Sequence, residues 1–147
     1  MAKPRFNKVF RAEEADSLIP RLEMLIRELQ LQANRLRDKV RELAQADENL
    51  RDLDLSGILE RYPALSPFAE RMSEIAVEID SMGCLLRDID QGLIDFPFKV
   101  NGSSARDEEI GFLCWQFGEP RVVAWHPIDG GFAGRRRLPG APKLYLN

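Results

Sequence analysis

The chain has 147 residues, of which 44% are hydrophobic and 31% are charged. This composition is ordinary for a globular protein and excludes a disordered chain, and the length is sufficient for one domain with a substantial core. The net charge of -3 and the pI near 5.3 argue against nucleic-acid binding. We therefore predict a single globular domain over residues 1–147.

Two further features predict the cellular environment. The basic residues near the start are followed by no apolar run, and no later stretch is long and apolar enough to span a membrane. Cys84 and Cys114 are the only cysteines, and they lack CxxC spacing. In a chain without an export signal they are expected to be reduced thiols. We expect a cytoplasmic protein that does not contact a membrane.

The first half has the pattern of a long amphipathic helix. Leucine recurs every seventh residue from Leu22 to Leu50, and a second apolar series runs from Ile19 to Val40. This pattern predicts a coiled-coil-like helix over residues 12–50. A DNA-binding basic zipper is not expected, because proline and acidic residues interrupt the few basic residues before the helix.

A second helix is predicted after a linker at residues 51–65. Ser66 followed by Pro67 is a strong start signal, and apolar residues then alternate in steps of four and three as far as Leu93. Gly92 is expected to end this helix, which gives it the bounds 66–92. Two seams joined by a short linker predict a long antiparallel two-helix hairpin. Gly83 interrupts the second helix, either for close approach to a neighbour or for ligand access.

The apolar period changes to two after the second helix, which predicts a three-stranded antiparallel β-meander over residues 93–127. Pro97 favours an edge position for the first strand. The central strand, 110–117, is apolar on both faces, and a helical hairpin can cover only one. The Gly/Pro-rich tail, 128–147, the first segment or a second subunit must cover the other face, and we expect a homodimer. The predicted fold class is α+β.

The candidate chemistry of the meander centres on His126, the only histidine. Asp95, Glu119, Asp129 and Cys114 are expected to lie near it in the folded meander. Histidine with two carboxylates can hold a divalent metal ion or transfer protons, and the predicted metal ligands are His126, Asp95 and Glu119. A hydrogen-bonded structural histidine is the alternative.

Two other groups leave alternatives open. Cys114 is either a nucleophile with His126 as its base or a small buried apolar residue. Three arginines, 135–137, follow a glycine-rich loop that could hold a phosphate or carboxylate. The loop lacks a Walker pattern, and three charges fall short of a nucleic-acid-binding surface.

Several short motifs together resemble a known family. They are Leu113-Cys114-Trp115, Gly118-Glu119, Trp125-His126 and the run Gly-Phe-Ala-Gly-Arg at 131–135. On these residues the chain, from Phe10 to about Leu138, resembles the bacterial family called domain of unknown function 2203. The resemblance implies a helical hairpin with a small sheet, and it assigns no activity.

The same resemblance implies a set of site residues and one departure from the family pattern. The characteristic polar residues of the family map to Asp88, Asp95, Glu119, His126 and Arg135. Arg11 stands where the family usually has a serine or threonine that caps the first helix, so the resemblance implies a frayed start of that helix.

Two functions are carried forward. The first is a self-associating interaction or scaffold domain, indicated by the long seams and the two-faced strand. The alternative is a small-molecule or divalent-metal-binding domain, enzymatic or not, with its site on the meander around His126. The first function, the interaction or scaffold domain, predicts no enzyme activity.

Overall fold

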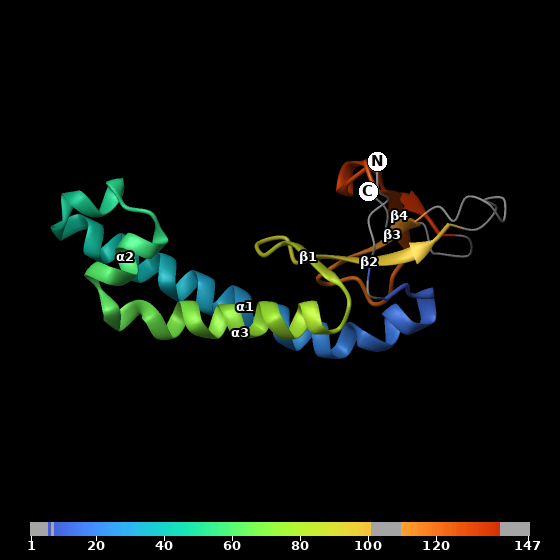
Figure 1. Ribbon diagram of the computed structural model, residues 1–147, viewed down its shortest axis with the longest axis horizontal. Coiled ribbons are helices and arrows are strands. Elements are labelled where there is room, and N and C mark those ends of the chain that lie inside the picture. The colour runs from blue at the N-terminus through green and yellow to red at the C-terminus, as the bar shows by residue number, and fades with distance from the viewer. Residues whose placement is uncertain (1–5, 7, 101–109, 139–147) are drawn as a thin grey trace.

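The computed structural model describes residue 6 and residues 8–100 and 110–138. The protein is α+β, with a long helix followed by a five-stranded antiparallel sheet (Figure 1). The predicted class is confirmed, but the predicted count of three strands is wrong. None of the helices that the structure describes combines the length and apolar character needed to cross a membrane.

Helix α1, Ala12–Ala46, carries the predicted apolar stripe, and its buried residues extend from Ala15 to Leu36. The Glu14 carboxylate accepts a hydrogen bond from the Arg11 backbone N–H at 3.0 Å, which satisfies one group at the start of the helix without a serine or threonine cap. The helix ends at Ala46 rather than at residue 50. Asp47 is extended there and caps a 3₁₀ turn, Glu48–Asp52.

The linker predicted at residues 51–65 is itself folded into short helical segments. Helix α2, Leu55–Arg61, and a 3₁₀ turn, Pro63–Leu65, follow the turn at 48–52. The Asp47 carboxylate accepts hydrogen bonds from the side chains of Arg61 and Tyr62. A small apolar cluster closes this end of the molecule, and its buried members are Leu36, Leu50, Ile58 and Leu65.

Helix α3, Ser66–Ser81, runs antiparallel to α1 and lies beside it (Figure 1). Two pairs of charged side chains link the helices, Arg21 with Glu78 and Arg71 with Glu28. Each pair is partly exposed and so contributes little to stability. A hairpin is therefore present, but its helices are unequal, with 35 and 16 residues. The long coiled-coil-like seam that was predicted for both helices is not found.

The predicted second helix, 66–92, is wrong beyond residue 81. Gly83 has a φ of 91° and turns the chain into strand β1, Leu85–Asp88. Gly92 also has a positive φ, 67°, but it lies in the turn between β1 and β2, not at a helix end. Leu86 and Ile89 kept the apolar spacing because they pack against the same core from a strand and a turn.

The other strands are β2, Leu93–Lys99, β3, Ile110–Gln116, β4, Ala124–Pro127, and β5, Arg136–Arg137. They pair in sequence order, and β3 is central as predicted. The edge position predicted from Pro97 is wrong, because β2 lies between β1 and β3. Pro97 is tolerated because β1 pairs only with residues 93–95. Its carbonyl accepts a hydrogen bond from the Phe10 N–H at 2.7 Å.

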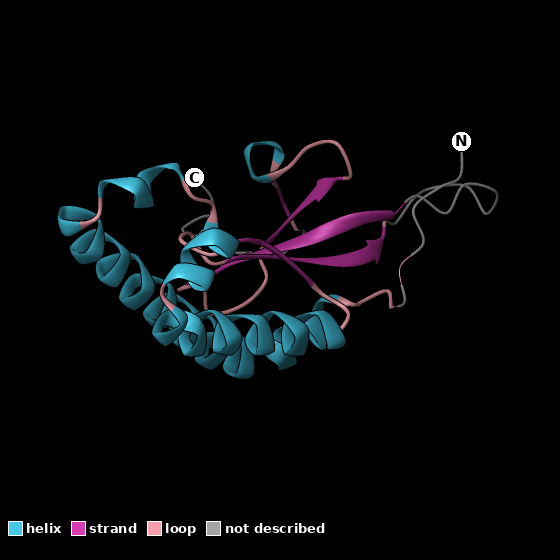
Figure 2. Ribbon diagram, turned by 60° about the vertical axis from the view of Figure 1, so that its left-hand side comes forward, coloured by secondary structure: helices cyan, strands magenta, loops and turns pink. Residues whose placement is uncertain are grey.

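The helices cover one face of the sheet (Figure 2). Ile94, Phe96, Leu113 and Trp115 pack there in one core cluster with residues of α1 and α3. On the other side, Phe6 meets Phe112 edge to face with ring centroids 5.4 Å apart. The chain after β4 supplies a 3₁₀ turn, Phe132–Gly134, and then β5.

Two of the three predicted covers of the second face, the first segment and the tail, thus contribute residues to it. The homodimer stays a prediction that this packing does not test. Residues 101–109 of the predicted meander and the end of the predicted tail, 139–147, lie outside the described residues.

Candidate functional site

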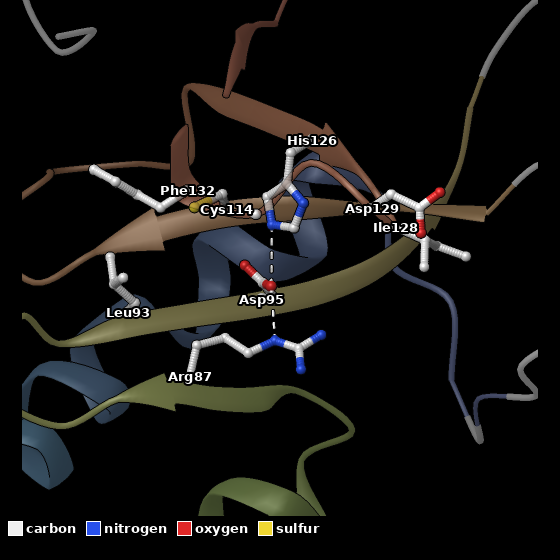
Figure 3. Close-up of a pocket in the computed structure, with 9 residues that line it drawn as sticks. Arg87, Leu93, Asp95, Cys114, His126, Ile128, Asp129 and Phe132 are labelled. Atoms are coloured by element: carbon white, nitrogen blue, oxygen red, sulfur yellow. Dashed lines mark hydrogen bonds and ion pairs between the residues drawn. The ribbon is translucent and has the colours of Figure 1, made fainter. Parts of the chain in front are cut away.

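Three adjacent strands place three reactive side chains on the sheet face opposite the helices. Asp95 on β2 pairs directly with Cys114 on β3. Cys114 in turn pairs with Ala124, and His126 lies two residues further along β4. Because alternate side chains of a strand share a face, His126 is the diagonal neighbour of Cys114 on that same face. Register thus brings Asp95, Cys114 and His126 together (Figure 3).

The three side chains form a tight, buried group. One possible ligand atom from each, a carboxylate oxygen, Sγ and an imidazole nitrogen, lies within 4.8 Å of the other two. The three residues are only 1–3% exposed. His126 Nε2 lies 3.0 Å from Asp95 Oδ2. We call Asp95, Cys114 and His126 the strand triad.

The hydrogen-bond partners of His126 define where its protons lie. Nδ1 lies 2.8 Å from the Pro127 carbonyl oxygen, which can only accept, so Nδ1 carries a proton. Nε2 faces a carboxylate oxygen of Asp95. A neutral imidazole has one proton, so the Asp95–His126 contact needs a second proton on one of its partners. A metal ion between the two groups would satisfy the same requirement.

Arg87 on β1 completes the charge balance around Asp95. Its Nε donates to Asp95 Oδ2 at 2.9 Å, and its guanidinium lies 5.0 Å from the centre of the Phe112 ring. Sequence reasoning missed this residue because it assigned residue 87 to the second helix. The available signal was the pair of glycines, Gly83 and Gly92, that bracket the β1 segment.

The surroundings of Cys114 favour the protonated form of its thiol. Burial, and then the nearby Asp95 charge, raise the pKa of Cys114 to about 12. Because the thiolate is the nucleophile, a thiol with this pKa is a poor one at neutral pH. The structure favours the buried alternative predicted for Cys114. Cys84 is also buried, and its thiol lies 3.3 Å from the Ile79 carbonyl oxygen.

Glu119 is not part of the strand triad. Arg135 Nη2 contacts both of its carboxylate oxygens, at 3.0 and 2.9 Å, and the Gln116 N–H donates to the same group at 2.7 Å. The predicted metal ligands His126, Asp95 and Glu119 are therefore only partly assembled, with Cys114 in the third place. The Arg135 side chain is buried, and its Nη2 is engaged by Glu119. Its Nε makes no hydrogen bond with the described residues.

Asp88, the remaining candidate, is the last residue of β1, directly before the turn to β2. Its Oδ1 accepts a hydrogen bond from the Gln91 N–H at 2.8 Å, which shapes the connection between β1 and β2. It does not line the cavity beside the strand triad.

A cavity of about 360 Å³ adjoins the strand triad. Arg87 lines it together with Leu93 and residues of the segment after β4, namely Ile128, Asp129, Gly131 and Phe132. Its size falls in the lower range of small-molecule sites.

The match to a protein family covers this whole arrangement. The model of the family described as "Uncharacterized conserved protein (DUF2203)" matches residues 8–138. The chain belongs to the DUF2203 family. The resemblance predicted from the short motifs is confirmed, and the matched range holds the strand triad, Arg87 and the Glu119–Arg135 pair. No curated protein and no solved structure matches this DUF2203 chain.

Proposed function

We propose that the protein binds a divalent metal ion such as Zn²⁺ through Asp95, Cys114 and His126. The observation that carries this proposal is the convergence of three potential ligand atoms within 4.8 Å of one another beside a cavity. Carboxylate, thiolate and imidazole are all ligands of zinc. The thiolate and imidazole favour such an ion over Mg²⁺ or Ca²⁺, which prefer oxygen ligands.

The orientation of His126 supports the same assignment. A metal-binding histidine commonly donates its second ring N–H to a backbone carbonyl or carboxylate, which fixes the ring and leaves the other nitrogen for the metal. His126 has this arrangement, because its Nδ1 is held by the Pro127 carbonyl and its Nε2 faces Asp95.

The distances require only small adjustments. Zinc bonds of about 2.0–2.3 Å place tetrahedral ligand atoms roughly 3.3–3.6 Å apart. The largest separation in the strand triad is within 4.8 Å, so side-chain movements of about 1 Å would close the set around an ion.

The free energy of deprotonating Cys114 does not prevent binding. With a pKa of about 12, holding the Cys114 thiolate at pH 7 costs about 7 kcal/mol. Structural zinc sites in small peptides supply roughly 10–16 kcal/mol of apparent binding free energy at pH 7, which already includes deprotonating ordinary thiols. Only the excess over an ordinary thiol, about 5 kcal/mol, therefore counts against binding. The ion would also take the place of the hydrogen-bond contact between Asp95 and His126.

Zinc titration of the purified full-length chain tests the proposal. We expect one Zn²⁺ per chain by isothermal titration calorimetry, and a thiolate-to-cobalt charge-transfer band when Co²⁺ is used instead. Cys114→Ala should abolish this band and lower zinc affinity at least tenfold, because it removes a ligand. Cys84→Ala is the matched control, since Cys84 is equally buried but lies outside the strand triad. No stoichiometric zinc binding, or equal losses in both variants, would contradict the proposal.

The hydrogen bonds of His126 favour a second candidate, proton transfer without a metal. The Asp95–His126 pair lies within hydrogen-bond distance and lines the cavity, where a general acid or base can reach a bound molecule. This candidate predicts that His126→Gln removes an activity that no chelator affects. An activity abolished by chelator and restored by Zn²⁺ would exclude it.

A further inference from the structure

The strand triad leaves a metal ion with an open coordination position. Among the described residues no fourth histidine, cysteine or acidic side chain joins the three. Glu119, which the sequence predicted as a metal ligand, instead accepts hydrogen bonds from Arg135 and the Gln116 N–H. Zinc held by three protein ligands keeps its fourth position for water or a substrate. The cavity beside the strand triad gives such a molecule room.

Arg87 offers unused hydrogen-bond donors to the same cavity. Its Nε is engaged by Asp95, whereas its terminal nitrogens form no hydrogen bond with any residue that the structure describes. Figure 3 shows these nitrogens turned away from Asp95. The side chain is 46% exposed, and its guanidinium carbon lies over the Phe112 ring, 5.0 Å from the ring centre. A guanidinium fork fixed in this way matches the two oxygens of a carboxylate.

The charges and walls of the cavity restrict the ligand further. Asp95 and the Cys114 thiolate would together cancel the charge of a divalent ion, which leaves Arg87 as the cation that faces a ligand in the cavity. Asp129 also lines the cavity and disfavours a dianion. Leu93, Ile128 and Phe132 supply apolar surface. A monoanion with an apolar body fits these surroundings better than inorganic phosphate.

From these observations we infer that the site takes a small apolar carboxylate, with one oxygen on the metal ion and its carboxylate hydrogen-bonded by the terminal nitrogens of Arg87. The inference rests on the proposed metal function and adds the chemical class of its ligand. It assigns Arg87 to ligand recognition, beyond its pairing with Asp95.

Calorimetric titration with benzoate tests the inference, at a zinc concentration that saturates each variant. We expect benzoate to bind the zinc-loaded protein at least tenfold more tightly than the metal-free protein. Arg87→Gln should weaken benzoate binding at least tenfold, and Arg87→Lys should restore only part of it, since an ammonium lacks the fork. The neutral analogue benzamide should bind at least tenfold more weakly than benzoate.

Arg21→Gln is the matched control, because Arg21 also pairs with a carboxylate and its side chain is 49% exposed, but it lies on α1 away from the cavity. It should bind benzoate as the wild type does, and circular dichroism checks that each variant is folded. If zinc binds but benzoate does not, or binds Arg87→Gln and wild type equally, the carboxylate site is wrong and the metal site stands. Phosphate binding tighter than benzoate also overturns it. If the wild type binds no zinc, both proposals fail.

Discussion

At the scale of single residues, burial decides what the two cysteines can do. Both are 1% exposed, one on each side of the sheet. Burial raises the pKa of Cys84 to about 11 and that of Cys114 to about 12. What separates them is their neighbours, because only Cys114 has a carboxylate and an imidazole within reach of a shared ion.

We therefore expect neither thiol to react with a disulfide reagent such as Ellman's reagent in the folded, metal-free protein at pH 7. The raised pKa keeps both as thiols, and the thiolate is the reactive form. Both should react within minutes in urea, where burial is lost. Rapid reaction of one thiol per folded chain, lost in Cys114→Ala and kept in Cys84→Ala, would instead identify Cys114 as an activated nucleophile.

At the scale of elements, the connections determine where the candidate site can form. The chain leaves α3 at Gly83, forms β1 and turns at Gly92, and this brings Arg87 beside Asp95. At the other end of the hairpin, Asp47 joins α1 to α2 through Tyr62 and Arg61. Each connection depends on a single residue, Gly92 in the turn between β1 and β2 and Asp47 between α1 and α2.

Gly92→Ala should destabilise the protein by about 2 kcal/mol or more, because a left-handed φ alone costs an L residue about 1–2 kcal/mol. In addition, the new Cβ would lie 2.5 Å from Phe117 Cβ. Urea denaturation measures the change in unfolding free energy. Gly134→Ala is the control, since its Cβ would meet nothing within 4 Å. Equal effects of the two substitutions would show that the β1–β2 turn is not constrained as described.

Asp47→Asn should destabilise the protein at pH 7 and cease to do so in acid. The hydrogen bond from Tyr62, and then that from Arg61, lower the pKa of Asp47 below its usual 3.8. A lowered pKa in the folded state stabilises above the usual value and loses this effect as pH falls through the folded value. Urea denaturation of both proteins from pH 7 to pH 2 should show the gap closing below about pH 4. A gap that is constant with pH would contradict this.

At the scale of the whole molecule, the question is whether the chain acts alone. The sequence argument for a homodimer was a sheet face that the helices cannot cover, and residue 6 and the segment after β4 now cover part of it. The most exposed large apolar side chains on the two long helices are Met24, 64%, and Val77, 65%. In a dimer, these two side chains could form an apolar contact between the helices of the two chains.

Light scattering after size exclusion tests the predicted homodimer. We expect the mass of two chains, and Met24→Glu combined with Val77→Glu should reduce it to one chain by placing charges in the contact. Val9→Glu, on an exposed apolar residue outside the helices, is the control. A wild-type protein that has the mass of one chain at all concentrations would remove the prediction.

Local pattern was sufficient for part of this fold. The heptad leucines determined α1, because only one stripe of a helix can face the core. The two-residue period determined β2, and a continuous apolar run determined β3. The same local logic failed at β1, where Leu86 and Ile89 kept a helical spacing. The spacing of apolar residues indicates only which side chains reach the core. A strand followed by a turn can place the same side chains in the core as a helix can.

The sequence by itself also identified most of the candidate site residues, Asp95 and His126 among them, since a lone histidine and a carboxylate within apolar strands are unusual. Only the tertiary structure decided how they group. Strand register placed Cys114, not Glu119, beside them, and the turn at Gly92 brought in Arg87. A shift of one residue in pairing would turn each side chain to the other face, and register depends on contacts between distant segments that no local pattern records.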